Sequence, residues 1–403
     1  MTLHLLTFST LYPNDRQPNH GIFVENRLRH LVASGEVTST VVAPVPWFPS
    51  RSSLFGDWAL FAGVAQTETR HGLTVHHPRY PVIPKFGMSI APYLLYWRTL
   101  SAIQHMLDVG LRFDAIDAHY VYPDGVAAAF IGKRLGLPVV ITARGTDVNL
   151  IPRHPGPRRL IQQAIKDSAA LVGVSAAIRA ALLELGAPPE KVTVLRNGVD
   201  VAVFTPMDRR VARANINLTR PTLISVGHLI ERKGHHRIIE AMTQLPEFDL
   251  LVVGEGPERE RLTAQINRSN LYHRVRLLGS RPHAELASLY SAADALVLAS
   301  SREGWPNVLL EAMACGTPVV ASNIWGNPEV VQDPTAGVLM TENTSDGVVE
   351  AVRRLFADLP DRDLTRAYAE RFSWDETTAG QISLFRSLCA HDLSSHRTGH
   401  GVG

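Results

Sequence analysis

The stretch from 296 to 322, LVLASSREGWPNVLLEAMACGTPVVAS, restricts the possible fold more than any other part of the chain. Its two apolar runs, LVLAS and TPVVAS, have the composition of buried strands. The segment between them predicts a loop with Glu303 and then a helix that begins with Pro306 and ends at about Cys315. Such strand–helix–strand units form parallel sheets that bind ligands off the carboxyl ends of the strands. Glu303 is therefore expected at a ligand-binding edge.

The same stretch contains a second acid, Glu311, separated from Glu303 by seven residues. If both were helical, they would lie about 12 Å apart along the axis, at ~1.5 Å per residue. That separation is too long for two carboxylates that share a proton or flank one glycosidic oxygen. The pair is better suited to two parts of one long ligand. The alternative is an ordinary pair of charges, one near a helix N-terminus and one on a helix surface.

The rest of the chain alternates short apolar runs with helical patterns, which is typical of a doubly wound α/β sheet. A first series of predicted strands covers 4–9, 40–44, 73–77, 114–119, 138–143, 170–175 and 192–195, with helices at 22–34, 88–107, 124–135, 158–167 and 176–185. A second series covers 223–227, 250–254, 275–279, 295–300, 318–322 and 337–340. We therefore predict two Rossmann-like domains, 1–205 and 206–374, that face each other across a ligand-binding cleft.

Composition limits the class of protein further. Of the 403 residues, 45% are hydrophobic and 19% charged, enough apolar material for substantial cores. Two cysteines in no metal or disulfide pattern, and an N-terminus without the basic region of a signal peptide, predict a cytoplasmic protein. Residues 1–205 carry 19 Lys and Arg against 14 Asp and Glu, a net charge of +5. This modest excess favours anionic partners but lacks the dense basic stripe of a nucleic-acid-binding protein.

Loops of the amino half carry polar candidates at the ends of predicted strands. Gly21 precedes a helix, where it serves either a left-handed turn or the approach of an anion. His119 ends one strand and is followed by Asp124, and the next strand leads to Arg144 and Asp147. Asp124, Arg144 and Asp147 are candidates for contact with an acceptor. An Arg144–Asp147 pair that only stabilises its loop remains the alternative.

The carboxyl half opens with a predicted phosphate site. Arg232, Lys233 and Gly234 follow a strand and precede a helix, so two cations and backbone N–H groups converge there. A solvated basic loop is the alternative. Ser280 and Arg281 end a later strand, where backbone groups could contact a nucleobase.

Together these residues resemble a glycosyltransferase of family 4, which has the GT-B fold. The motifs that carry the resemblance are NHGIFVENRLRHL, DAHYVYPDG, the RKG loop, RNGVD at 196–200 and SREGWPNVLLEAMACGTPVVAS with its two glutamates. The likeness extends over nearly the whole chain except 391–403, which we expect to be a disordered tail. It also implies that a helix at 375–390 packs back on the first domain. Members of this kind often build bacterial surface polysaccharides.

The resemblance implies a role for each matching residue. Glu303 would contact hydroxyls of the transferred sugar, and Glu311 the ribose of the nucleotide. Lys233 would bind the diphosphate, and His119 would lie under the sugar at the reaction centre. The remaining donor contacts implied are Gly21, Arg232, Ser280, Arg281 and the backbone N–H groups of Gly304, Trp305 and Asn307. In one departure from many relatives, His228 replaces an Arg after the Gly that ends the first strand of this half, and Arg232 is the candidate to supply the missing charge.

The implied activity is transfer of a hexose-type sugar, with retention of configuration, from a nucleoside diphosphate sugar to a glycan, lipid-linked or small-molecule acceptor. No metal cofactor is expected, because Lys233 and helix N-termini can stabilise the leaving diphosphate. The alternative is an inactive relative that binds nucleotide sugars or carbohydrates. The segment 79–98, RYPVIPKFGMSIAPYLLYWR, has the composition of a membrane-interfacial segment. Two interpretations are open: a core helix with an ordinary loop before it, or peripheral association with the inner face of an anionic membrane.

Overall fold

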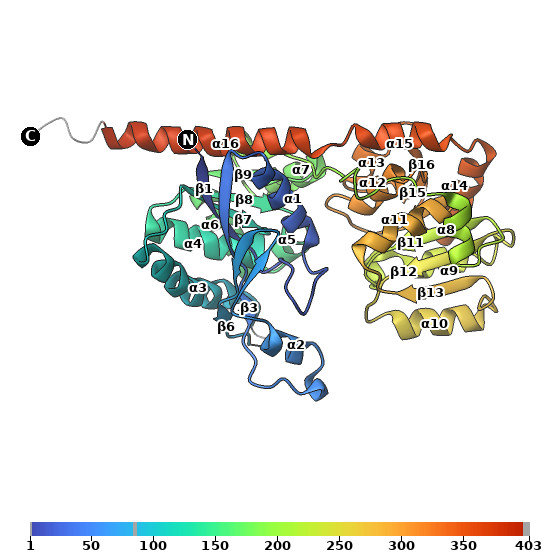
Figure 1. The fold of residues 1–403 in the computed structure, drawn as a ribbon, viewed down its shortest axis with the longest axis horizontal. Helices are drawn as coiled ribbons and strands as arrows, with labels where there is room; N and C mark the ends of the chain where they lie inside the picture. Colours follow the sequence, from blue (N-terminus) through green and yellow to red (C-terminus); the bar gives the residue numbers. More distant parts are fainter. Residues whose placement is uncertain (1, 84–86, 398–403) are drawn as a thin grey trace, which may run out of the picture. The chain divides into compact units, whose positions relative to one another are not determined.

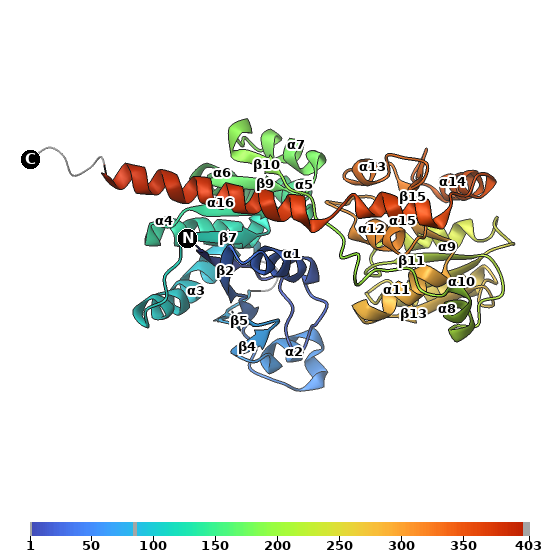
Figure 2. The same cartoon turned by 45° about the horizontal axis from the view of Figure 1, so that its top comes forward.

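The computed structural model describes residues 2–83 and 87–397, apart from the side chains of 53, 57, 284 and 391–397. The chain forms two compact units (Figures 1 and 2). Unit 1 consists of Met1–Arg196 and Asp375–Gly403, and unit 2 of Asn197–Trp374. Each unit is an α/β domain built on its own sheet.

The sheet of unit 1 has the strand order β10-β9-β8-β7-β1-β2-β5-β4, in which only the β4–β5 pair is antiparallel. Its strands are β1 (Leu3–Phe8), β2 (Val37–Val42), β4 (Thr67–Arg70), β5 (Leu73–His76), β7 (Ala115–His119), β8 (Val139–Ala143), β9 (Ala170–Gly173) and β10 (Val192–Val194). Two short strands, β3 (Val45–Pro46) and β6 (Arg79–Tyr80), form a separate parallel pair. The strand order reverses between β1 and β7, so loops from both strands meet at the carboxyl edge there.

The helices of unit 1 are α1 (Ile22–Ala33), α2 (Asp57–Gly63), α3 (Ala91–Asp108), α4 (Val126–Leu135), α5 (Thr146–Asn149), α6 (Pro155–Asp167), α7 (Ala176–Glu184) and, from Asp375 on, α16 (Trp374–Arg397). Figures 1 and 2 both show α16 lying along this unit. Ile382 and Phe385 of α16 pack into a core with Leu5 and Val140 of the strands, and Phe385 is fully buried. Such burial contributes about 1.5–3 kcal/mol per large side chain, which keeps the helix on unit 1.

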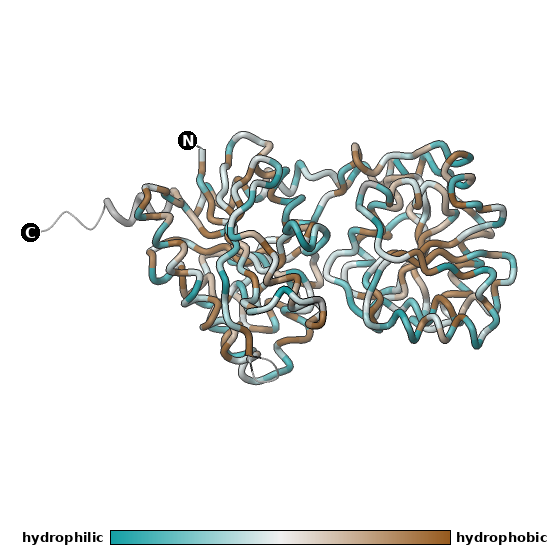
Figure 3. The backbone as a smooth tube through the Cα atoms, turned by 60° about the horizontal axis from the view of Figure 1, so that its bottom comes forward, coloured by the Kyte–Doolittle hydropathy of each residue, from teal (hydrophilic) through white to brown (hydrophobic). Residues whose placement is uncertain are grey.

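The sheet of unit 2 is parallel throughout, with the order β13-β12-β11-β14-β15-β16. Its strands are β11 (Thr222–Val226), β12 (Asp249–Val253), β13 (Val275–Gly279), β14 (Ala295–Leu298), β15 (Val319–Ser322) and β16 (Gly337–Met340). Its helices are α8 (Arg209–Asn215), α9 (His235–Ala241), α10 (Arg259–Arg268), α11 (His283–Ala292), α12 (Asn307–Ala314), α13 (Asn327–Val330), α14 (Ser345–Ala357) and α15 (Arg362–Glu370). Figure 3 shows the hydrophobic residues concentrated along the strands of this unit, where one large core cluster lies. The order reverses between β11 and β14, the Rossmann arrangement.

The structure corrects several boundaries drawn from the sequence. Unit 2 begins at Asn197 rather than at 206, because the segment after β10 packs against unit 2. Val199 N–H donates to Phe372 O at 2.9 Å, and the Arg366 guanidinium donates to Val201 O and Phe204 O. The helix predicted to begin with Pro306 begins at Asn307, with Pro306 as its cap.

The predicted tail at 391–403 is helical as far as Arg397, where α16 ends, and 398–403 lie outside the described residues. Strands β3, β4 and β6 were not predicted. Strand β4, with the sequence TETR, lies at the sheet edge and alternates exposed with half-buried residues, so it has no apolar run to reveal it.

Candidate functional site

The reversal of strand order in unit 2 brings two loops together. The loop after β11 carries Lys233, and the loop after β14 carries Glu303. Lys233 Nζ donates to Glu303 Oε1 at 2.6 Å, although the two residues are 70 positions apart. Ser300 Oγ donates to the same oxygen at 2.7 Å. The two strongest candidates from the sequence therefore form one site at the carboxyl edge of the sheet.

Charge and burial determine the state of Glu303. Its side chain is 7% exposed and that of Lys233 is 15% exposed. Burial favours the protonated form, but Lys233 and Arg232 outweigh this effect and hold the pKa of the Glu303 carboxyl below its usual range. Glu303 is therefore ionised at neutral pH. Its carboxylate can accept a hydrogen bond from a sugar hydroxyl.

Arg232 lies in the same site. Its Nη1 is 3.6 Å from Glu303 Oε2 and donates to Arg302 O at 2.7 Å. Partial burial lowers the pKa of His228, and the positive charges of Lys233 and Arg232 lower it further. Arg232 therefore places a second positive charge near Glu303.

Glu311 occupies a separate position on α12. Tyr290 Oη of α11 donates to Glu311 Oε2 at 2.9 Å, and His283 Nε2 is 3.6 Å from Glu311 Oε1. Burial lowers the pKa of His283, but the hydrogen bond and charge of Glu311 outweigh it and raise the pKa above its usual value. The Glu311 side chain is 14% exposed.

The residues between the two glutamates stabilise the loop. Trp305 Nε1 donates to Asn197 O at 2.9 Å, and Asn197 Nδ2 donates to Asn307 Oδ1 at 3.3 Å. The backbone N–H of Asn307, expected to face the sugar, donates to Trp305 O at 3.1 Å. In this conformation the N–H is used within the loop, so contact with a sugar would require it to exchange partners. Gly304 is buried beside the backbone of Gly326.

Ser280 and Arg281 do not join this group. Both are exposed and follow β13, the edge strand, three strands from β14. Arg281 Nη1 is 3.7 Å from Glu285 Oε2, an exposed pair on neighbouring turns. The structure places them at the same edge of the sheet as Glu303 without contact between them.

In unit 1, His119 ends β7 at the point where the strand order reverses. Its ring is 1% exposed and both ring nitrogens are hydrogen-bonded. Arg144 Nη2 donates to Nδ1 at 2.8 Å, so Nε2 carries the proton and donates to Asp117 Oδ2 at 3.1 Å. Burial lowers the pKa of His119 although Asp117 opposes this shift, which makes the ring neutral at neutral pH. Contact between this ring and a sugar hydroxyl would require one of these hydrogen bonds to break.

The alternative role of Asp147, stabilising its loop, describes the structure better than contact with an acceptor. Its fully buried carboxylate accepts from three backbone N–H groups, those of Val121 (2.8 Å), Gly145 (2.6 Å) and Arg144 (3.1 Å). Those bonds leave Asp147 unavailable to an acceptor. The Arg144 side chain reaches His119 and lies over the ring of Phe23, 4.9 Å from its centroid.

Asp124 and Gly21 are also buried in unit 1. Thr10 Oγ1, just beyond β1, donates to Asp124 Oδ2 at 3.0 Å, while Asp124 Oδ1 is buried without a partner in the described part of the chain. Burial raises the pKa of Asp124 to about 8, so it is largely protonated at neutral pH. Gly21 caps α1 with φ +68°, and a Cβ there would lie 2.3 Å from Leu11 C. The turn alone therefore requires a glycine at this position.

Sequence reasoning missed four residues that support these candidates: Asp117, Ser300, His283 and Tyr290. The position of Asp117 could have been predicted, because it precedes His119 by two residues and side chains two positions apart on a strand share a face. Ser300 had one as well, at the end of the strand before Glu303. His283 and Tyr290 lie on α11, and only tertiary packing brings them to Glu311.

The described residues contain no group of three or more His, Cys, Asp or Glu side chains arranged to hold a metal ion. None of their helices is both long and apolar enough to span a bilayer.

Comparison with solved structures assigns the fold class. A sucrose-phosphate synthase from Thermosynechococcus elongatus aligns with a TM-score of 0.79 at 21% identity, covering 97% of this chain and all of that one. A protein from Anabaena, solved in complex with UDP-glucose, aligns with a TM-score of 0.69 at 18% identity over 98% of this chain and all of that one. The two Rossmann-like units have the GT-B fold, as predicted.

Sequence comparison then gives the family. The family described as Glycosyltransferase Family 4 matches residues 21–203, and Glycosyl transferases group 1 matches residues 207–372. A D-inositol 3-phosphate glycosyltransferase of Segniliparus rotundus is 32% identical over 68% of this chain, which spans 66% of that relative's length. A putative teichuronic acid biosynthesis glycosyltransferase of Bacillus subtilis is 27% identical over 80% of this chain and 82% of its own. The chain belongs to the family 4 glycosyltransferases.

Proposed function

We propose that the protein is a retaining glycosyltransferase that moves a hexose from a nucleoside diphosphate sugar to a glycan, lipid-linked or small-molecule acceptor. The observation that carries the proposal is the Lys233–Glu303 pair at the reversal of strand order in unit 2. Open α/β sheets bind ligands at this position. Unit 2 would bind the donor, and unit 1 the acceptor.

The charges of unit 2 match the parts of such a donor. Lys233 and Arg232 would bind the diphosphate, and ionised Glu303 would accept hydrogen bonds from hydroxyls of the sugar. Glu311, eight positions further along the chain on α12, would accept from the ribose. In this proposal a diphosphate draws Lys233 from Glu303, whose carboxylate then accepts from the sugar hydroxyls.

The same groups supply the chemistry. As the bond between the anomeric carbon and the phosphate oxygen breaks, negative charge grows on the leaving diphosphate, where fixed cations stabilise the transition state. The acceptor hydroxyl would attack from the side of the leaving group, and the departing phosphate would take its proton, which retains the configuration. Lys233 and Arg232 provide the positive charge, so the proposal includes no metal ion.

His119 is a less direct part of this proposal. The resemblance implies ring contact with the sugar, whereas Arg144 and Asp117 hold both ring nitrogens. We propose that Arg144 releases Nδ1 when the donor binds. Donor hydrolysis by His119→Ala and Arg144→Met provides the test, with the larger loss of rate expected for His119→Ala. An equal rate in wild type and His119→Ala would remove His119 from the site.

A surface of unit 1 supports peripheral association with an anionic membrane. Strand β3 pairs with β6, and Trp47 N–H donates to Tyr80 O at 2.7 Å, so two segments leave this pair together. One face of α3 buries Leu95 and Ile103 in the core, as the core-helix alternative predicted, while the other stays exposed. The large exposed apolar side chains of these segments are Trp47, Leu54, Phe55, Leu60, Val82, Ile83, Met88, Ile90, Tyr93 and Trp97.

Vesicle sedimentation tests this association. We expect binding to anionic and not to zwitterionic vesicles, and weaker binding for Tyr93→Ser than for Tyr272→Ser, a similarly exposed tyrosine of unit 2. Equal sedimentation with both vesicle types, or none with either, would contradict the proposal.

Donor hydrolysis without acceptor separates an active transferase from a non-catalytic relative. UDP-sugars are the first donors to test, because the related Anabaena structure contains UDP-glucose. Slow release of nucleoside diphosphate that disappears in Lys233→Ala supports the transferase. Saturable binding without any release under acceptor-free and acceptor-containing conditions would support a binding protein instead.

A further inference from the structure

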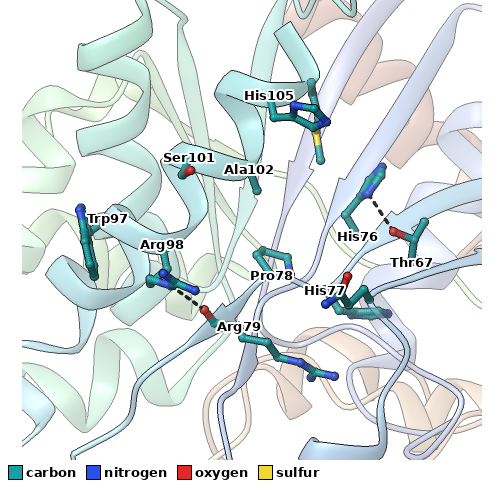
Figure 4. A pocket seen from close by; sticks show the side chains of 12 residues that line it. Thr67, His76, His77, Pro78, Arg79, Trp97, Arg98, Ser101, Ala102 and His105 are labelled. Atoms are coloured by element: carbon teal, nitrogen blue, oxygen red, sulfur yellow. Dashed lines mark hydrogen bonds between the residues drawn. The ribbon is translucent and has the colours of Figure 1, made fainter. Parts of the chain in front are cut away.

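Unit 1 contains a cavity of about 550 Å³ between β5 and α3. In Figure 4, Trp97 and Arg98 of α3 lie on one side, and Thr67 and His76 lie on the other. His76 ends β5 level with Val42, the last residue of β2. The cavity therefore reaches the carboxyl edge of the sheet, the edge that also carries His119.

Strand spacing gives the separation of this cavity from His119. Strands β7, β1, β2 and β5 are consecutive neighbours in the sheet. Three spacings of ~4.8 Å place the end of β5 about 14 Å from the end of β7. That distance exceeds the length of one sugar ring, so the cavity is separate from the residues assigned to the reaction centre.

The residues that line the cavity are cationic or neutral, and none is Asp or Glu. They include Arg79, Arg98, His76 and His105, besides the hydroxyl-bearing Thr67 and Ser101. His77 also lines the cavity, but both of its ring nitrogens are already hydrogen-bonded, to Ala43 O and to Glu68. This donor-rich lining is complementary to an anion.

The two arginines form no ion pair with a carboxylate in the described part of the chain. Arg98 Nε donates to Arg79 O at 3.1 Å, and its guanidinium carbon lies 5.6 Å from the centroid of the Trp97 ring. Arg79 Nη1 is buried without a hydrogen-bond partner among the described residues. Arg79 Nη2 donates to Val64 O and Nη1 is buried, so of the two guanidinium groups the exposed one of Arg98 is the one that an anion in the cavity can reach.

We propose that this cavity binds a phosphate group carried by the acceptor, with Arg98 as the main contact. The ring of Trp97, which is 64% exposed, offers an apolar face for a sugar attached to that phosphate. The link to an acceptor rests on the proposed function, whereas phosphate binding does not. The proposal predicts an acceptor longer than one sugar ring, with its phosphate about 14 Å from the reacting hydroxyl.

Binding of inorganic pyrophosphate tests the site directly. Lys233→Ala removes the strong diphosphate contact of unit 2, so equilibrium dialysis of this variant with labelled pyrophosphate reports the cavity. We expect one remaining site, whose affinity falls about tenfold in Lys233→Ala/Arg98→Gln and is unchanged in Lys233→Ala/Arg134→Gln. Arg134 is an exposed arginine of α4, so the control removes the same charge from unit 1.

Each outcome of this experiment has one meaning. Equal affinity in the Arg98 and Arg134 variants, both folded by circular dichroism, would overturn the cavity site and leave the proposed function intact. Two sites of wild-type affinity in Lys233→Ala would instead contradict the donor site of the proposed function. The Arg98 variant would still decide the cavity.

Competition then identifies the source of the phosphate. A phosphorylated monosaccharide that displaces pyrophosphate from Lys233→Ala supports a free phosphomonoester. A polyisoprenyl diphosphate in detergent micelles that does so supports a lipid-linked acceptor. Failure of both to compete would overturn the assignment of the cavity to an acceptor.

Discussion

The polar clusters of the two units, both at reversals of strand order, differ in what their side chains contact. In unit 1, Asp147 is bonded to three backbone N–H groups and His119 is bonded through both ring nitrogens. In unit 2, Glu303 is bonded to side chains, those of Lys233 and Ser300, and these can move without any change in the backbone. Asp147 thus stabilises its loop through the backbone, whereas Glu303, like His119 with Arg144 and Asp117, is bonded to other polar side chains.

This difference shows which candidates are open to a ligand. A side chain that accepts hydrogen bonds from backbone N–H groups stabilises the fold, so its removal lowers the free energy of unfolding. In an ion pair, the cation can bind an anionic ligand group in place of the carboxylate, and the carboxylate can bind a ligand donor in place of the cation. Substitutions in unit 2 should therefore change catalysis, and those in unit 1 should change stability first.

The largest effect is expected at the Lys233–Glu303 pair. Lys233→Ala and Glu303→Ala should each lower kcat by about 10²–10³, because stabilising contacts to the leaving diphosphate or to the sugar are lost. Steady-state kinetics with the true donor and acceptor provides the measurement. Since each change leaves a buried charge without its partner, melting curves are needed as a control, and Ser300→Ala should fold and retain most activity. Near-normal rates in both alanine variants would refute the site.

The next effect is expected at Asp147 in unit 1. Asp147→Ala leaves three buried backbone N–H groups without an acceptor, which should lower the free energy of unfolding by about 2–4 kcal/mol. Urea denaturation measures this change. In the fraction that remains folded, KM for the donor should stay within about twofold of wild type. A stable variant with a raised KM would instead assign Asp147 to substrate binding.

A smaller effect is expected for Glu311→Gln. The substitution keeps the shape of the side chain and removes the charge, so a ribose hydroxyl loses a charge-assisted acceptor, worth about tenfold in donor KM. The rate at saturating donor should change little, because Glu311 is not at the breaking bond. Tyr290→Phe, which removes only the hydroxyl that donates to Glu311, is the matched control. An unchanged KM in Glu311→Gln would exclude the ribose contact.

A further prediction concerns pH and Asp124. Its folded-state pKa of about 8 lies above the unfolded value of 3.8, so between about pH 4 and 8 the folded state binds more protons than the unfolded state. Asp124 therefore contributes stability at low pH that is lost as pH rises, by at most about 1.4 kcal/mol per pH unit. Asp124→Asn should become more stable relative to wild type from pH 5 to pH 8 in urea titrations. Parallel pH profiles of the two proteins would show that Asp124 is ionised in the fold.

The sequence was sufficient for the elements whose signals are local. Buried parallel strands are continuous apolar runs, so β11 to β16 could be predicted from their sequences. That Lys233 and Glu303 belong to one site was implied by the family resemblance. Strand β4 lacks such a run, and the two-residue strands β3 and β6 are defined only by their pairing.

Roles that depend on contacts between distant residues could not be predicted in the same way. Nothing in the sequence around Asp147 shows that Val121 donates to it, because that contact depends on how two loops fold against each other. The unit boundary lies at Asn197 for the same reason, since the Arg366 guanidinium donates to the carbonyl oxygens of Val201 and Phe204. Local patterns predicted which residues are polar at the sheet edge, and only packing showed which of them are already used.

One measurement tests the central claim most directly, that the Lys233–Glu303 pair binds and activates a nucleotide sugar. It is the rate of nucleoside diphosphate release from a panel of UDP-, GDP- and ADP-hexoses, compared between wild type and Glu303→Gln. The account predicts saturable release from at least one donor by wild type and a loss of about 10²-fold in Glu303→Gln. Equal release by both proteins, or no binding of any donor by the wild type, would contradict it.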